Sequence, residues 1–271
     1  MMDERRRSHY LAAMGVTLWT LRDVQDRPAL AGTVALEATY MPGSPARLRG
    51  EPGPDAMMPP VDPPGVPVAA ETPPPEKTGV SDPAQMDWDQ LEAAVAGCRA
   101  CGLCDTRTNT VFGDGNRRAR LMVIGEAPGA DEDRAGVPFV GRAGQLLNRM
   151  LAAIGYPRES VYIANVLKCR PPGNRDPRPE ESLRCQGFLA RQVQLIRPGA
   201  ILAVGRIAAQ HLLQTDESVG RLRGRWLELG PDRIPVRVTY HPAYLLRSPE
   251  QKAKVWDDLT LVRRRLDASS G

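Results

Sequence analysis

The chain has 271 residues, of which 42% are hydrophobic and 25% charged, a composition typical of a folded globular protein rather than a disordered one. Its formal net charge of +4 is compatible with an anionic partner, although charge alone does not establish one. No apolar run approaches the roughly 18–20 residues that cross a bilayer, and no small-residue cleavage site of a signal peptide follows the basic N-terminus. We therefore expect a cytoplasmic protein without membrane association.

The first part of the chain differs in composition from the rest. Residues 1–40 carry a short amphipathic pattern, with apolar residues spaced three and four positions apart: Tyr10, Leu11, Met14, Leu18 and Leu21. Between Pro42 and Pro75 there are 12 prolines, which predicts a disordered linker over residues 41–86. The composition then becomes that of a folded domain, which we expect over residues 87–271.

The folded domain alternates between strand and helix patterns. Short apolar runs predict strands at residues 120–125, 161–167, 200–205 and 235–240. Helical patterns predict helices at residues 142–154, 179–196, 206–213 and 249–266. This alternation predicts an α/β fold, a three-layer αβα sandwich with a central four-stranded parallel sheet. Because ligands of such folds bind beyond the carboxyl ends of the strands, we expect the chemistry in the loops that follow them.

Three long motifs occupy these loops. They read GEAPGADEDRAGVPFVGRAGQLL (125–147), VYIANVLKCRPPGNRDPRPEE (161–181) and HPAYLLR (241–247). Together they resemble the signatures of family 4 uracil-DNA glycosylases, over about residues 88–267. The resemblance implies the fold of those enzymes and their activity on single- or double-stranded DNA. Such an enzyme flips uracil out of the DNA and hydrolyses its N-glycosidic bond, which leaves an abasic site and starts base-excision repair.

Three side chains are candidates for holding the flipped base. Phe139 lies between glycines and prolines and is the candidate stacking face. Asn165 lies inside an otherwise apolar strand, near its end, and its amide carries both the donor and the acceptor needed to read the uracil edge. His241 follows a strand and is the candidate donor to uracil O2, where negative charge develops as the bond breaks.

The remaining catalytic and binding assignments follow from the resemblance. Glu126 is the first candidate for positioning water and Glu132 the second, because Ala127 stands where distant uracil glycosylases carry an aspartate. Gly125 and Gly129, together with Ala127, are expected to let the backbone approach the nucleotide. In the last motif, Leu245 or Leu246 is expected to wedge into the base stack and Arg247 to contact a phosphate.

Five cysteines, an odd number, suggest a metal or cluster site rather than disulfides. By the family pattern the ligands are Cys98, Cys101, Cys169 and Cys185, which implies a [4Fe–4S] cluster. On spacing alone, four thiolates also suit tetrahedral zinc, and a Cys101–Cys104 pair is an alternative to Cys98–Cys101.

The N-terminal segment at residues 7–23 is not needed for this chemistry. It is similar to the segment of the polymerase III psi subunit that binds the chi subunit, so chi is a possible partner of an otherwise monomeric enzyme. Two other functions compete with the glycosylase. A covalent uracil-DNA trap is disfavoured because residues 168–183 contain no histidine, unlike the inserted loop of such proteins. An iron–sulfur electron carrier or zinc-stapled DNA-binding module would not explain Phe139, Asn165 and His241.

Overall fold

The structure is a computed structural model that describes residues 82–269 of the chain. The predicted partner-binding segment and most of the predicted linker therefore lie outside the described residues. Met86, which directly precedes the predicted boundary at residue 87, is buried in a small core cluster. No helix in the described range 82–269 combines the length and apolarity needed to span a membrane.

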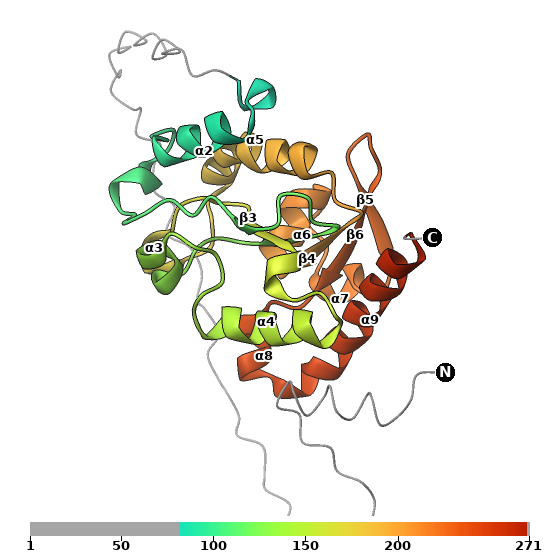
Figure 1. Cartoon of the computed structure of the whole chain (residues 1–271). Coiled ribbons are helices and arrows are strands. Elements are labelled where there is room, and N and C mark those ends of the chain that lie inside the picture. Colours follow the sequence, from blue (N-terminus) through green and yellow to red (C-terminus); the bar gives the residue numbers. More distant parts are fainter. Residues whose placement is uncertain (1–81, 270–271) are drawn as a thin grey trace, which may run out of the picture. The chain divides into compact units, whose positions relative to one another are not determined.

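The described residues are built around a six-stranded sheet with the strand order β1-β3-β2-β4-β6-β5 (Figure 1). The strands are β1 (Asp114–Gly115), β2 (Leu121–Gly125), β3 (Tyr162–Asn165), β4 (Ala200–Val204), β5 (Trp226–Leu229) and β6 (Ile234–Thr239). The central strands β3, β2, β4 and β6 are all parallel, which confirms the predicted parallel core.

The prediction of only four strands was wrong, because an antiparallel strand closes each edge of the sheet. The β1 strand has two residues, too few to produce a periodic pattern. The β5 strand is only partly buried, as expected of an edge strand, so it lacks the continuous apolar run that marks the central strands.

Helices cover both faces of the sheet, as the sandwich prediction requires (Figure 1). One face packs against α4 (Arg142–Ala153), α8 (Pro242–Arg247) and α9 (Lys252–Ala268). The other packs against α5 (Pro179–Ile196), α6 (Arg206–Leu213) and α7 (Val219–Leu222). Successive strand residues alternate between these two cores, with Val123 in the first and Met122 and Ile124 in the second, as the twofold period of a strand dictates.

Helix prediction succeeded where the apolar period was long. The helices at 179–196 and 206–213 have the predicted bounds, and α4 ends one residue earlier than predicted. The last predicted helix instead begins with a short 3-10 turn, η6 (Pro249–Gln251), before α9.

Two short helices near the predicted site were not predicted. One is α3 (Ala130–Ala135), whose sequence ADEDRA has no apolar stripe, and the other is α8. A third unpredicted helix, α2 (Trp88–Ala96), packs with Leu91 and Val95 near α5. Its N-terminus carries a capping box between Asp87 and Gln90.

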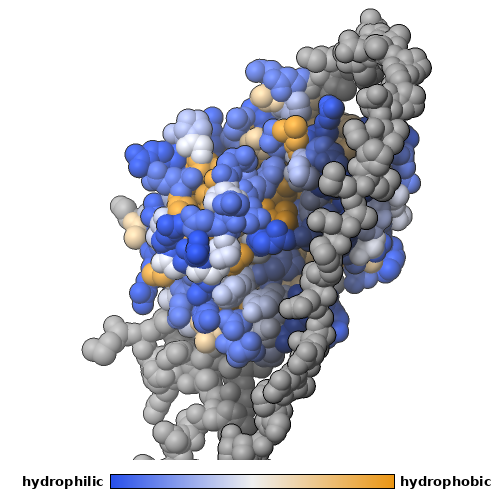
Figure 2. Space-filling view, turned by 180° about the vertical axis from the view of Figure 1, so that it is seen from behind, coloured by the Kyte–Doolittle hydropathy of each residue, from blue (hydrophilic) through white to orange (hydrophobic). Residues whose placement is uncertain are grey.

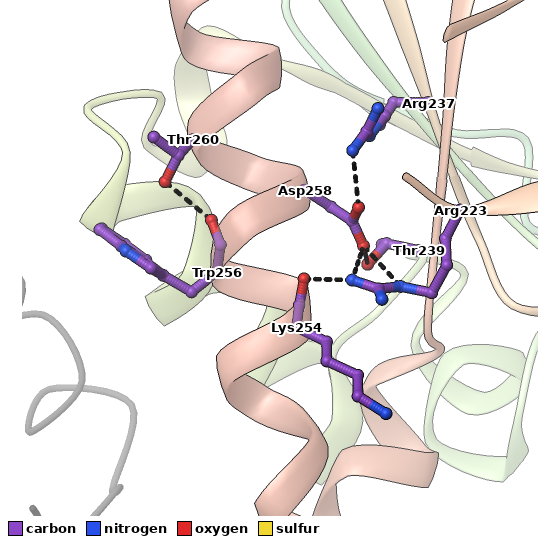
Figure 3. A network of polar contacts seen from close by, with 7 residues as sticks. All are labelled: Arg223, Arg237, Thr239, Lys254, Trp256, Asp258 and Thr260. Carbon is purple, nitrogen blue, oxygen red and sulfur yellow. Dashed lines mark hydrogen bonds and ion pairs between the residues drawn. The ribbon is translucent and has the colours of Figure 1, made fainter. Parts of the chain in front are cut away.

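A buried polar network fastens α9 to the sheet (Figure 3). The Asp258 carboxylate accepts hydrogen bonds from Arg237 Nη2 (3.0 Å) and Thr239 Oγ1 (2.9 Å), both on β6. It also accepts one from Arg223 Nε (3.0 Å), whose guanidinium further donates to the Lys254 carbonyl. A buried carboxylate is tolerated only when it is paired in this way. The network therefore fixes the end of β6, from which the predicted catalytic loop departs.

Candidate active site

The predicted site residues come together at the carboxyl ends of the parallel strands. Gly125 ends β2 and Asn165 ends β3, and the two are paired across the sheet. His241 follows β6 by two residues and caps the N-terminus of α8. This is the edge at which the alternation of strands and helices predicted the chemistry.

Phe139, Gly125 and Asn165 are in close contact. A Cβ atom built on Gly125 would lie 2.6 Å from Phe139 Cζ and 2.4 Å from Asn165 Oδ1, so only glycine fits there. The Phe139 and His241 rings lie 5.7 Å apart between centroids, with planes inclined at 33°. One aromatic ring, one carboxamide and one imidazole thus converge, as the sequence predicted.

The Asn165 side chain is buried, with 1% of its surface exposed. Its Oδ1 has no hydrogen-bond partner among the described residues. An unsatisfied buried acceptor costs roughly 1–3 kcal/mol. A ligand that offers an N–H group to this oxygen would recover that free energy.

His241 is held as a neutral imidazole. Its Nδ1 accepts a hydrogen bond from the Ala243 backbone N–H (3.1 Å), which leaves the ring proton on Nε2. Burial, aided by the nearby Arg247 cation, lowers the pKa of His241 to about 4, although Glu132 opposes this shift. At neutral pH the ring is therefore an uncharged Nε2–H donor.

Glu126 is half-buried directly after β2. Burial, followed by the negative charge of Asp176, raises the pKa of Glu126 to about 7, and the Arg206 cation partly opposes the shift. Arg206 at the start of α6 also forms an ion pair with Asp176. Near neutral pH this carboxyl is thus able to gain or lose a proton.

Glu132, the second candidate for positioning water, is bound to the backbone. Its carboxylate accepts hydrogen bonds from three backbone N–H groups, those of Gly129 (3.1 Å), Val140 (3.0 Å) and Gly141 (3.0 Å). With its oxygens engaged by the backbone, Glu132 is less suited than Glu126 to orient a water molecule. Its contacts instead organise the loop that carries Phe139.

The last motif divides into a buried and an exposed part. Leu245 is 1% exposed and belongs to the main core, which corrects its assignment as a possible DNA wedge. Leu246 is 38% exposed, and Arg247 is exposed beside it. Because successive helix residues point in different directions, Leu246 is the one of these two leucines that reaches the surface.

Four of the five cysteines line one hollow, together with Arg107, Leu167 and Lys168. They are the predicted ligands Cys98, Cys101, Cys169 and Cys185. Cys104 does not line this hollow, and its thiol lies 3.3 Å from Asp105 Oδ1. Ala127, predicted to lie near the nucleotide, is half-buried and packs against a small cluster that contains Cys169.

The chemistry of these four thiols indicates which kind of group they can hold. Within residues 82–269, no three His, Cys, Asp or Glu side chains are grouped to hold a single metal ion. Thiolates around one zinc ion lie about 3.8 Å apart, given Zn–S bonds of about 2.3 Å. Four cysteine thiols that line one hollow are the donor set of a [4Fe–4S] cluster, so the residues present fit that group.

Two charged residues near the predicted site were not identified from the sequence, namely Lys168 and Arg158. Lys168 is buried, and its Nζ donates to the Asn165 carbonyl (3.0 Å) and to Gln192 Oε1 (2.6 Å). Arg158, which precedes β3, donates to the backbone around Phe139. The only available signal was a charged residue next to an apolar run, which is common and unspecific.

Comparisons with known proteins agree with this geometry. The family model of the uracil DNA glycosylase superfamily matches residues 112–260. The type-4 uracil-DNA glycosylase of Archaeoglobus fulgidus is 45% identical over 180 residues, which cover 64% of this chain and 90% of the relative. The type-4 uracil-DNA glycosylase of Thermotoga maritima is 46% identical over 171 residues, covering 61% and 87%. A type-5 uracil-DNA glycosylase of Pyrobaculum aerophilum is 30% identical over 146 residues, covering 48% and 64%.

Proposed function

The chain belongs to the uracil-DNA glycosylase superfamily and, within it, to the type-4 group, and from this premise we propose that it removes uracil from DNA to start base-excision repair. The reaction hydrolyses the N-glycosidic bond and leaves an abasic site. The observation that carries the proposal is the convergence of Phe139, Asn165 and His241 on one edge of the sheet. Neither an electron carrier nor a simple DNA-binding module requires that convergence.

Recognition of uracil begins with the orphaned oxygen of Asn165. Uracil presents an N3–H donor beside its O4 acceptor, and a carboxamide offers the complementary acceptor and donor. Cytosine carries an acceptor at N3, so it would leave Asn165 Oδ1 unsatisfied. The flipped base would meanwhile stack on the Phe139 ring.

Cleavage is assisted by the neutral His241. As the glycosidic bond breaks, electrons move onto the departing uracil and the sugar becomes oxocarbenium-like. The Nε2–H of His241 stabilises the growing negative charge at uracil O2 through a hydrogen bond. Because the Ala243 amide occupies Nδ1, the proton already lies on Nε2, and no tautomer change is needed.

Water attack on the sugar is assigned to Glu126. Its half-buried carboxylate, when ionised, accepts a proton from water and favours the adjacent positive charge on the sugar. Glu132, the second candidate from the sequence, is proposed instead to support the pocket loop. The exposed Leu246 is proposed to fill the gap left by the flipped base, with Arg247 on a neighbouring phosphate.

The cysteine hollow is proposed to hold a [4Fe–4S] cluster through Cys98, Cys101, Cys169 and Cys185. When bound, the cluster supplies a structural tie between the segment before β1 and the loop after β3. Arg107 supports this ligand set, because its Nη1 donates to Cys169 Sγ (3.0 Å) and its Nη2 to the Cys98 carbonyl (2.7 Å). Cys104 is left outside the set.

The decisive experiment is a gel assay of purified protein on a uracil-containing oligonucleotide. Abasic product in molar excess over protein supports the proposal, whereas a heat-stable protein–DNA band on a denaturing gel would indicate the covalent trap. His241→Ala and Asn165→Ala, checked by circular dichroism for intact folding, should each abolish most of the release. Unchanged release by both variants would refute the assignment of the site.

Further parts of the prediction extend beyond the described residues. We propose that residues 7–23 bind the chi subunit of the clamp loader and that the enzyme is a cytoplasmic monomer. Deleting residues 1–40 should leave uracil release intact and abolish capture of purified chi. Capture by the shortened protein would refute the partner assignment.

A further inference from the structure

Phe139 has a backbone conformation that side chains other than glycine rarely adopt. Its φ is +53°, in the left-handed region, and its ring is 6% exposed. Such a conformation persists only where the surroundings fix it, and it is often found at functional sites. We propose that Arg158 is a positioning residue for uracil removal, which acts by clamping the Phe139 backbone together with Glu132.

The Arg158 guanidinium is engaged by four different groups. Its Nη2 donates to the Pro138 carbonyl (2.8 Å) and its Nη1 to the Phe139 carbonyl (3.2 Å). Asp114 on β1 accepts from Nη2 (2.8 Å) and Nε (3.2 Å), and Asn148 Oδ1 on α4 accepts from Nη1 (3.3 Å). The planar fork of arginine is suited to such simultaneous contacts, and lysine cannot reproduce them.

Glu132 binds the other side of the same loop. Arg158 holds the carbonyls of residues 138 and 139, and Glu132 holds the N–H groups of residues 140 and 141. Two side chains of opposite charge therefore fix the three successive peptide groups between Pro138 and Gly141. Gly144 of α4 completes the clamp, because a Cβ atom there would lie 1.9 Å from the Phe139 carbonyl oxygen.

The clamp determines where the ring lies relative to the rest of the site. The ring contacts Gly125 and lies beside His241. If the clamp loosens, the left-handed conformation loses its support and the ring moves away from the base. This inference rests on the proposed function, in which Phe139 stacks on the flipped uracil, and it adds that Arg158 acts only through Phe139.

A double-mutant cycle tests that statement. Uracil release from single-stranded DNA is measured under single-turnover conditions for Arg158→Met, Phe139→Ala and the double variant. Arg158→Met should lower the maximal rate constant by about 10- to 100-fold, because misplacement of about 1 Å in a reacting site has effects of that size. In the Phe139→Ala background, the same substitution should change the rate by less than about twofold.

Two milder variants keep the test valid if Arg158→Met folds poorly. Arg158→Lys retains the charge but not the fork, and Asp114→Asn weakens the partner that orients the guanidinium. Both should slow release by a smaller factor, and both effects should also vanish without the Phe139 ring.

Arg191 provides a matched control. Its Nε donates to the Met86 carbonyl (2.6 Å), so it also fixes a backbone segment, but one packed on α5. Arg191→Met should lower the melting temperature while changing the release rate by the same small factor with and without Phe139. An effect of Arg158→Met that is equally large in both backgrounds, or absent in both, would overturn the inference. Absence of release by the wild-type protein would instead refute the proposed function.

Discussion

Substitution of Gly125 by alanine gives a direct test of the close contacts among Gly125, Phe139 and Asn165. The added methyl group would lie 2.4 Å from Asn165 Oδ1 and 2.6 Å from Phe139 Cζ. Ordinary van der Waals contact begins at 3.4 Å. The carboxamide would therefore have to move by 1.0 Å (3.4 − 2.4) and the ring by 0.8 Å (3.4 − 2.6), unless the strands separate.

A displacement of that size has a predictable effect on the rate. Misplacement of about 1 Å lowers the rate by roughly 100-fold, which corresponds to about 2.7 kcal/mol in the activation free energy. We expect Gly125→Ala to show this loss in single-turnover release, together with an overpacking cost of about 1–3 kcal/mol in the free energy of unfolding.

Gly187→Ala on α5 is the matched control. A Cβ atom there would lie 3.5 Å from the Pro83 ring, in ordinary contact, and should not affect release. Denaturant titration would verify that both variants are folded under the assay conditions. A folded Gly125→Ala protein with a release rate within about twofold of wild type would refute the close contacts of Gly125 with Asn165 and Phe139.

Four further predictions follow from the site. The pKa of Glu126 is raised to about 7, and water activation requires the ionised carboxylate. The release rate should therefore fall about tenfold from pH 8 to pH 6. A Glu126→Gln variant whose release rate falls equally steeply with pH would contradict the assignment. Between pH 6.5 and pH 4, His241 binds a proton in the unfolded chain but not in the folded protein, where its pKa is about 4. Lowering the pH from 7 to 4.5 should therefore reduce the free energy of unfolding by roughly 2–3 kcal/mol more in the wild type than in His241→Gln. Urea titration measures this difference. Cys169→Ser should lose the visible absorbance of the bound cluster while Cys104→Ser keeps it, and the opposite result would exchange their roles. Leu246→Ala should slow release from double-stranded DNA more than from single-stranded DNA, whereas Leu245→Ala should lower the free energy of unfolding by about 2–5 kcal/mol without that preference.

Much of the fold was predictable because the central strands and long helices bury continuous or periodic apolar surfaces. The elements that escaped prediction, such as β1, α3 and α8, are short and fixed mainly by tertiary contacts. The convergence of Phe139, Asn165 and His241 was predictable because strand ends meet at one edge of a parallel sheet and because long motifs pointed to them.

The division of labour within the site was less predictable. Glu126 and Glu132 are both acids in one motif, and only their contacts separate a half-buried carboxyl from one that binds the backbone. Likewise, Leu245 and Leu246 are chemically identical neighbours, and only the packing of α8 shows which one faces outward. The role of Arg158 depends on a loop conformation that a one-dimensional pattern does not encode.

Few large hydrophobic side chains are exposed on the described part of the protein. In the view opposite to that of Figure 1, hydrophilic residues dominate and hydrophobic ones form only small groups (Figure 2). Leu183 and Leu246 are the large hydrophobic residues exposed within the described part of the chain.

The carboxylate of Asp258 connects α9 to β6, the strand that leads to His241. It accepts a hydrogen bond from Thr239 at the end of β6, and His241, the proposed electrostatic catalyst, follows two residues later. Substitutions in α9 that disturb the Asp258 contacts should therefore shift His241 through β6, even where the substituted residue does not contact the nucleotide. Some inactivating substitutions should accordingly lie in this helix. They should misplace His241 rather than weaken the affinity for DNA.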